Sequence, residues 1–402
     1  MPKPEDTVRY EKFTGLRNNV SSDSFDVTDL EVADNIDIDA AGGVARRAGR
    51  TRYSATATHS LWGDREIALC VQGTTLYRVN TDYSLTAIKT GLTTGRRMAY
   101  TRINDLVYMT NGVESFVLDG GRVRSWGLPV PPYPTLLIGT GNMPAGTYQL
   151  TTTYQRNDGQ ESGARIAARF DSSVNGSITL GFVPPTDPDV VQHNVYLSPP
   201  NGDVMYLALE VPVANASAVY AGDTSEFAYP LKTQFLSAPQ PGALLGYYRG
   251  CALVAVDNMI FPSESFAYEL YDPRNYIPAD GKITLLAPLE DSSASGIFVG
   301  TDRSTGILVG DEPGKFRYVP RENYGTIFGA QTMIDGSLFD IASPATDGKM
   351  LPTWQSLQGL CIGLPGMEIR NLTRTKVSLT NGVNGTMLFM PGPNRLISVS
   401  SQ

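Results

Sequence analysis

Residues 252–262 read Ala-Leu-Val-Ala-Val-Asp-Asn-Met-Ile-Phe-Pro, which is an apolar run, a polar pair and a second apolar run. Residues 102–110 repeat this arrangement with Asn104 and Asp105 as the polar pair. Apolar runs of strand length on either side of two turn-forming residues are typical of β-hairpins. The two segments therefore predict that the chain is built from short antiparallel strands.

Similar signals recur along the chain. Ile67–Val71 and Thr75–Val79 predict strands, Arg102–Gly112 predicts a strand that runs into a turn at Asn111-Gly112, and Asp119-Gly120-Gly121 predicts a hairpin turn. Later hairpins are expected at Gly296–Thr301 with Gly306–Gly310, at Leu357–Gly363, and at Gly385–Pro391 with Leu396–Val399. Hairpins at intervals of some tens of residues favour the blades of a β-propeller, although neither a Trp-Asp nor a kelch signature is present.

The composition agrees with an all-β chain that has many turns. The 402 residues include 40 Gly and 27 Pro, spread along the whole length, with aromatic and β-branched residues between them. This length is enough for two or three domains.

A separate unit is expected in the middle of the chain. Leu128–Pro134 contains four prolines and reads as a linker, because proline cannot continue a sheet. The next 100 or so residues contain the alternating segment Ala145–Tyr154, the turn Asn157–Ser162 and later strands. The later strands are Ser177–Phe182, His193–Leu197 and Met205–Val211. The pattern predicts a small β-sandwich, and its order of strands and turns resembles a fibronectin type III domain.

The segments before and after this unit look alike, so the sequence predicts one β-propeller with a β-sandwich inserted in it and an extended N-terminal arm. The expected boundaries are an assembly arm over residues 1–55, the first part of the propeller over 56–131, the fibronectin type III-like sandwich over 132–238, and the second part of the propeller over 239–402.

Charge and cysteine usage narrow the class of function. The net charge is −8, which argues against a protein that grips nucleic acid through a basic face. Cys70, Cys251 and Cys361 are widely spaced in apolar runs and are expected to be buried free thiols. The polar start of the sequence does not read as a secretory leader, and no apolar run reaches the length of a membrane span.

Catalytic and metal-binding constellations are weak. His59 is expected in a loop and His193 on a sandwich strand, and two histidines cannot form a histidine-based zinc cluster. Paired carboxylates are the best enzymatic candidate, drawn from Asp257, Glu264, Glu269 and Asp272 and from Asp335 and Asp340. Asp257-Asn258 and Asp335-Gly336 read more simply as hairpin turns, and Glu264 and Glu269 as a solvated rim. Asp34, Asp37 and Asp39 lack the spacing of a calcium loop. The sequence therefore predicts no enzyme, cofactor or metal.

Two stretches carry a resemblance to a known family. Residues 13–53, from Phe-Thr-Gly-Leu-Arg-Asn-Asn to Arg-Arg-Ala-Gly-Arg-Thr-Arg-Tyr, resemble the N-terminal signature of phage tail proteins, and residues 251–313 resemble a later part of the same group. The chain is similar to the tail nozzle, or tail tubular, proteins of short-tailed bacteriophages. The resemblance implies a structural protein of the virion tail, made in the host cytoplasm. It would form a ring, hexameric in this group, below the portal–adaptor complex. Its partners would be other copies of itself, the portal–adaptor protein, tail fibre or spike proteins, and double-stranded DNA passing non-specifically through the lumen.

The N-terminal arm is the expected assembly device. Phe13 and the arginines Arg46, Arg47 and Arg50 are the candidate subunit-interface residues, and with Arg52 these arginines form the only strong local cluster of basic charge. A clamp on an acidic neighbouring subunit is favoured over contact with DNA phosphates, because the whole chain is acidic.

Two other hypotheses stay open. One is a propeller-based protein that binds or cleaves carbohydrate, and the other is a different virion component such as a tail stabiliser or receptor-binding piece.

Overall fold

The computed structural model describes residues 12–401 except 25, 40, 50, 53, 65, 174, 226, 290–295, 340–345, 347, 379–381 and 393. The described residues form 34 β-strands and four short 3-10 helices, with no α-helix among them. The chain is therefore all-β, which confirms the predicted class.

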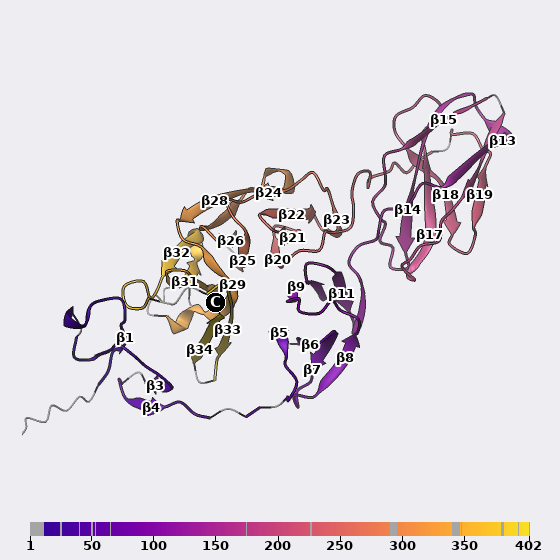
Figure 1. Cartoon of the computed structure of the whole chain (residues 1–402). Helices are drawn as coiled ribbons and strands as arrows, with labels where there is room; N and C mark the ends of the chain where they lie inside the picture. The colour runs from indigo at the N-terminus through magenta and orange to yellow at the C-terminus, as the bar shows by residue number, and fades with distance from the viewer. Residues whose placement is uncertain are drawn as a thin grey trace, which may run out of the picture. The chain divides into compact units, whose positions relative to one another are not determined.

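The chain divides into two compact units. Unit 1 contains residues 1–58, 279–309 and 317–402, and unit 2 contains residues 59–278 and 310–316. Figure 1 labels many of the strands of both units.

Unit 2 contains three four-stranded antiparallel meanders, in which each strand pairs with the next along the chain. The first consists of β5 (His59–Gly63), β6 (Ala68–Gln72), β7 (Thr75–Val79) and β8 (Leu85–Lys89). The second consists of β9 (Ala99–Ile103), β10 (Leu106–Thr110), β11 (Ser115–Asp119) and β12 (Arg122–Ser125). The third consists of β20 (Leu244–Tyr248), β21 (Cys251–Val256), β22 (Met259–Glu264) and β23 (Ala267–Tyr271), with β24 (Ile277–Pro278) beside β22.

The turns between these strands follow the sequence signals, with one correction. Asp257 has a φ of 50°, in the left-handed region, and joins β21 to β22 as a hairpin turn. Asn104 has a φ of 54° and joins β9 to β10 in the same way. The prediction of one strand from Arg102 to the turn at Asn111-Gly112 was therefore wrong, because the polar pair at 104–105 already reverses the chain.

Successive meanders in unit 2 share hydrophobic cores. Leu69 and Leu76 of the first meander are buried with Met109 of the second. Tyr108 and Val117 from the opposite face of the second meander are buried in a different core with residues of the third. The residues that the third meander adds to this core are Leu245, Ala252, Val254, Phe261 and Tyr271. The second and third meanders are therefore packed against each other although more than 100 residues lie between β12 and β20.

Those intervening residues form a two-sheet module. One sheet has the strand order β13-β16-β19, and the other has the order β15-β14-β17-β18. The strands are β13 (Thr135–Met143), β14 (Gly146–Arg156), β15 (Ala168–Ser172), β16 (Gly176–Gly181), β17 (Val190–Leu197), β18 (Tyr206–Pro212) and β19 (Ser217–Tyr220). Both sheets bury side chains in one core, among them Leu150 and Val195 from one sheet and Ile178 and Leu180 from the other.

Unit 1 contains two further meanders. The fourth consists of β25 (Ile283–Leu289), β26 (Gly296–Thr301), β27 (Thr305–Val309) and β28 (Arg317–Glu322). The fifth consists of β29 (Thr326–Asp335), β30 (Met350–Ser356), β31 (Gly359–Leu364) and β32 (Glu368–Asn371), with β33 (Asn384–Met390) and β34 (Arg395–Ser401) added beyond β29. Phe298 of the fourth meander and Trp354 of the fifth lie in one core with ring centroids 5.3 Å apart. The N-terminal residues add β1 (Gly15–Leu16), β2 (Asp29–Leu30), β3 (Ile36–Ile38) and β4 (Val44–Arg46).

The 3-10 helices are η1 (Ser22–Ser24), η2 (Pro313–Lys315), η3 (Gly336–Leu338) and η4 (Pro365–Met367). Asp335 lies at the start of η3 and accepts a hydrogen bond from the backbone N–H of Ser337, so it is a helix cap rather than the hairpin turn that was predicted. No closed barrel or propeller is found among the described residues, and the propeller remains a prediction.

Candidate functional site

Three of the four predicted interface residues, Phe13, Arg46 and Arg47, lie on or next to the small strands of the N-terminal segment. The backbone N–H of Phe13 donates to Gly42 O at 2.9 Å. Arg46 is exposed at the end of β4, and Arg47 forms an ion pair with Asp37 at 3.3 Å. Arg50 lies outside the described residues. Phe13, Arg46 and Arg47 thus belong to the β3–β4 region of one chain, and their role in a subunit interface remains a prediction.

The N-terminal segment docks on the C-terminal part of the same unit. The Asn18 side chain accepts from the Ser378 backbone N–H at 2.7 Å and donates to Ser378 O at 3.1 Å, so it satisfies both backbone groups of that residue. Asp37 forms a second ion pair with Arg395 of β34 at 2.9 Å. These contacts are polar and lie at the surface, and surface ion pairs contribute little stability.

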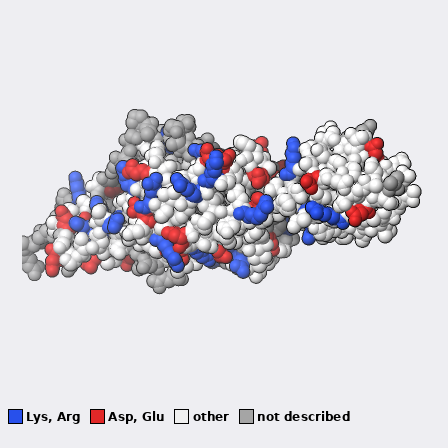
Figure 2. All heavy atoms as spheres, turned by 90° about the horizontal axis from the view of Figure 1, so that it is seen from above, with Lys and Arg blue, Asp and Glu red and all other residues white. Residues whose placement is uncertain are grey.

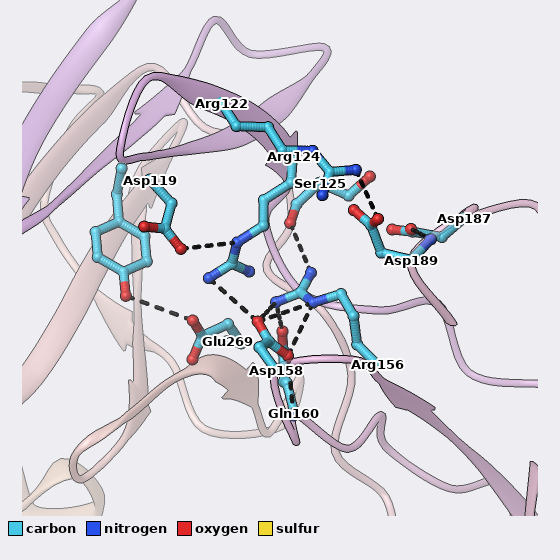
Figure 3. Close-up of polar contacts among 11 residues, drawn as sticks. Asp119, Arg122, Arg124, Ser125, Arg156, Asp158, Gln160, Asp187, Asp189 and Glu269 are labelled. Atoms are coloured by element: carbon cyan, nitrogen blue, oxygen red, sulfur yellow. Dashed lines mark hydrogen bonds and ion pairs between the residues drawn. The ribbon is translucent and has the colours of Figure 1, made fainter. Parts of the chain in front are cut away.

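A cluster of charged side chains, here called the polar hub, lies where the two-sheet module meets the second and third meanders of unit 2. Its members come from four parts of the chain and are shown in Figure 3. They are Asp119 of β11, Arg122 and Arg124 of β12, Arg156 at the end of β14, Asp158 and Asp189 in loops of the module, and Glu269 of β23.

Arg156 is the centre of the polar hub. It is only 1% exposed, which is rare for an arginine unless its charge is paired. Its Nε donates to both carboxylate oxygens of Asp158, at 3.2 and 3.1 Å, and its Nη1 donates to the backbone oxygen of Ser125 at 3.2 Å. Its Nη2 also donates to Gln160. Because Ser125 ends β12, this one side chain ties the module to the second meander.

Two other arginines add to the same joint. Arg124 has a side chain that is 10% exposed and forms ion pairs with Asp158 at 3.4 Å and with Asp119 at 3.8 Å. Arg122 donates from Nη2 to Asp189 Oδ1 at 2.6 Å. Asp158 thus receives two guanidinium groups, and both Arg122 and Arg124 of β12 contact carboxylates of the module. A guanidinium has a defined set of donors, so the paired ones fix the geometry of the network. Arg124 Nε and Nη1 are buried without a hydrogen-bond partner among the described residues, so this arginine contributes through its ion pairs.

Glu269 brings the third meander to the polar hub. Its Oε1 accepts from the hydroxyl of Tyr108 at 3.4 Å. Burial raises the pKa of the Glu269 carboxyl, and the positive charge of Arg124 opposes this shift. Burial also raises the pKa of the Tyr108 hydroxyl, with the Glu269 charge adding to the effect. The prediction that Glu269 lies on a solvated rim was therefore wrong, because β23 places its carboxyl within the packed joint.

The backbone next to the polar hub is closely packed. Trp126 donates from Nε1 to Tyr268 O at 2.8 Å, and its ring lies 5.0 Å from that of Tyr108. Gly127 has a φ of +76°, and a Cβ there would lie 2.9 Å from Ala238 Cβ and 2.9 Å from Glu269 O. Only glycine fits this position without strain, so the chain leaves β12 by a fixed path.

Among the other carboxylates singled out in the sequence, Glu264 and Asp272 interact electrostatically. Glu264 is partly buried, which raises the pKa of its carboxyl, and the Asp272 charge adds to the rise. Arg274 hydrogen-bonds Asp272 at 2.9 Å and lowers the pKa of that carboxyl. Asp257 lies in the β21–β22 turn, which confirms its predicted role, and Asp340 is outside the described residues.

The histidines and the buried thiols have structural positions. His193 is on β17, is 2% exposed and stacks on Phe182 at 4.6 Å between centroids, and burial lowers its pKa. His59 begins β5, so its assignment to a loop was wrong. All three cysteines are buried and free, as predicted.

Asp39 accepts from the backbone N–H groups of Ala41 and Gly43 at 2.9 and 2.7 Å, as a turn residue does.

Among the described residues, no group of three or more His, Cys, Asp or Glu side chains could hold a metal ion. None of the described helices is long and apolar enough to cross a membrane.

Sequence reasoning missed the polar hub. It assigned Asp158 to a turn and gave Arg122, Arg124 and Arg156 no role. The available signal was that these three arginines lie on strands or at the end of one, where a charge needs a partner. A comparison with known protein families gave no match, and a comparison with curated proteins gave none either.

Proposed function

We propose that this chain is a structural protein of a short-tailed phage virion. In this proposal several copies form the ring-shaped nozzle below the portal–adaptor complex, which channels the genome and anchors fibres or spikes. The proposal rests first on the sequence resemblance of residues 13–53 and 251–313 to nozzle proteins.

The structural observation that carries the proposal is the series of five four-stranded antiparallel meanders. In unit 2 the first three share cores in chain order, and in unit 1 the fourth and fifth do the same. In a propeller, successive blades are small antiparallel sheets that stack face to face in chain order. We therefore propose that the meanders are propeller blades and that the two-sheet module is a fibronectin type III-like insertion between the second and third.

The polar hub supports a structural role for that insertion. A module joined by flexible linkers alone would reorient freely. Here Arg156 donates to Ser125 O at the end of β12, and Arg124 and Arg122 of β12 form ion pairs with Asp158 and Asp189 of the module. A fixed module suits a wall component or a dock for fibres, which must transmit force without bending. The net charge of −8 suits a lumen that DNA passes without being trapped, because it offers no excess of cations to replace the DNA counterions.

Electron microscopy of the purified full chain tests the proposal. Closed rings viewed along an axis are the expected result, together with a particle mass that is a multiple of the 43.4 kDa chain. A strictly monomeric particle at all concentrations, both purified and in virion material, would overturn it.

A second candidate function has one observation in its favour. The rise in the Glu264 pKa and the fall in the Asp272 pKa are the opposite shifts that an acid and its ionised partner need in glycoside hydrolysis. Degradation of a polysaccharide that is lost in both Glu264→Gln and Asp272→Asn would favour this candidate. Retained degradation in both variants would exclude these residues as the catalytic pair.

A further inference from the structure

The three-stranded sheet of the module has no charged side chain on any strand. Its strands read Thr-Leu-Leu-Ile-Gly-Thr-Gly-Asn-Met (β13), Gly-Ser-Ile-Thr-Leu-Gly (β16) and Ser-Ala-Val-Tyr (β19). The opposite sheet, in contrast, carries Arg156, Arg169, Asp171 and Glu210. On the face of the module that Figure 2 turns to the viewer, Lys, Arg, Asp and Glu are sparse.

Among the described residues, no strand pairs with the outer edge of β13 or of β19, although the Asn142 N–H at the end of β13 donates to Ala221 O at 2.9 Å. β16 lies in the middle, and β13 and β19 pair with it from either side. The strand register aligns Leu137, Thr179 and Val219 in one row across the sheet. Leu137 is 70% exposed and Val219 is 59% exposed, so the row ends in an uncovered apolar side chain at each edge.

A long, uncharged edge strand with exposed apolar residues is a hazard, because its unpaired backbone groups can pair with any other strand. Proteins normally protect such an edge with lysine, proline, a charge or a covering segment. β13 contains none of these protective residues, but a bulge between Thr140 and Met143 interrupts it, so the regular edge covers residues 135–140. Ile138 beside Leu137 is also 54% exposed. The edge is thus suited to a strand that is added from outside.

We propose that the β13 edge of one copy pairs with the β19 edge of a second copy of this chain, so that the three-stranded sheet continues from subunit to subunit. This inference deepens the proposed function, on which it rests, by naming a contact between subunits of the ring. A second copy fits because the two edges match: both are uncharged, and each presents one large apolar side chain from the same row.

The direction of the strands defines the contact further. β13 and β19 both run antiparallel to β16, so they are parallel to each other. Repeating the sheet side by side therefore brings β13 of one copy next to β19 of the next in parallel. Leu137 would then lie beside Val219 of the second copy, and cross-strand apolar neighbours of this kind stabilise a sheet. Such a contact joins two different surfaces, and contacts of this type generate closed rings or open filaments.

Disulfide cross-linking of the full chain tests the contact. Leu137 and Val219 of one chain lie two strand spacings apart, about 9.5 Å, which is beyond the reach of a disulfide within the chain. The variant with both Leu137→Cys and Val219→Cys should therefore give covalent multimers under oxidising conditions. Mixed single variants, one with Leu137→Cys and one with Val219→Cys, should give a covalent dimer of the two different chains.

The matched control is Leu137→Cys with Thr179→Cys, whose positions are neighbours within one chain and should give only a monomeric band. The three native cysteines are buried and add little background. As a second measurement, Leu137→Lys and Val219→Lys should each reduce the oligomeric fraction at least tenfold, whereas Thr179→Lys on the central strand should leave most of it. Circular dichroism confirms that each variant is folded.

The outcomes separate this inference from the proposed function. Covalent multimers with rings in electron micrographs support both, and covalent multimers in open filaments support the contact but overturn the ring. Rings without cross-linking, and unaffected by the two lysine variants, would overturn the contact and leave the proposed function standing. A monomer in every measurement would overturn both.

Discussion

Replacing Arg156 with Met tests the joint between the module and the second meander. Methionine retains much of the apolar stem of arginine but removes all of its donors. The change would leave Ser125 O and Gln160 without their Arg156 contacts, and Asp158 with Arg124 as its remaining cation, at 3.4 Å. We expect the attachment of the module to weaken, with the Arg124–Asp158 and Arg122–Asp189 ion pairs remaining, and unit 2 to lose stability.

The size of the effect follows from burial. Removing one partner of a buried ion pair destabilises a protein by about 3–5 kcal/mol. Arg156 is fully buried, but the Asp158 side chain is 36% exposed and keeps a second partner, so the low end, about 3 kcal/mol, applies. For a unit of this size each kcal/mol shifts Tm by about 2–4 °C, which predicts a fall of about 6–12 °C.

The assay is differential scanning calorimetry of the full chain, with urea unfolding for the free energy. Asp105→Asn is the control, because its side chain is fully exposed and should change Tm by less than about 1 °C. The double variant with Arg156→Met and Asp158→Asn removes both charges of the pair and should be about 1–2 kcal/mol less destabilised than the sum of the single variants. A fall in Tm below about 2 °C would refute the role given to Arg156, and strict additivity would refute its pairing with Asp158.

Three further predictions concern other positions. Gly127→Ala should destabilise unit 2 by more than about 2 kcal/mol in urea unfolding. The control, Gly73→Ala, should cost only about 1 kcal/mol, because φ is also positive at Gly73 but no atom lies within 4 Å of its added Cβ. Equal losses of stability in the two variants would contradict the close packing around Gly127. Because the pKa of Glu269 is raised in the folded state, its contribution to stability is full below the unfolded pKa near 4.5 and is lost as the pH rises through the folded pKa. Glu269→Gln should therefore raise Tm more at pH 8 than at pH 4. The reversed order would contradict a raised pKa at this position. Asn18→Ala should speed hydrogen exchange at the Ser378 amide by at least tenfold without changing exchange in unit 2, and unchanged exchange at Ser378 would show that the N-terminal segment is not held there.

Local sequence signals predicted the strands well because they depend on neighbouring residues. Thr75–Val79 has the predicted bounds, and Gly296–Thr301 with Thr305–Val309 form the predicted hairpin. The error at Arg102–Gly112 arose because a polar pair inside an otherwise strand-like run can either face solvent or turn the chain. Asparagine adopts positive φ more readily than most residues, and Asn104 does so here, which favours the turn.

The polar hub could not be predicted because it depends on contacts between residues far apart in the sequence. Arg156 contacts Ser125, and Glu269 contacts Tyr108 from 161 positions away. In the sequence, Asp158 next to Gly159 reads as a turn, which is also correct, since Asp158 Oδ1 accepts from the Gln160 backbone N–H. Only the packing of the module against β12 shows that the same carboxylate also holds two guanidinium groups.

The central claim is that copies of this chain form a ring around the tail axis of a virion. A density map of a short-tailed phage particle that contains this protein tests it most directly. We predict that the meanders of units 1 and 2 and the two-sheet module fit density that repeats around the DNA channel below the portal. Density for this chain away from the tail axis, or no such density in the particle, would contradict the claim.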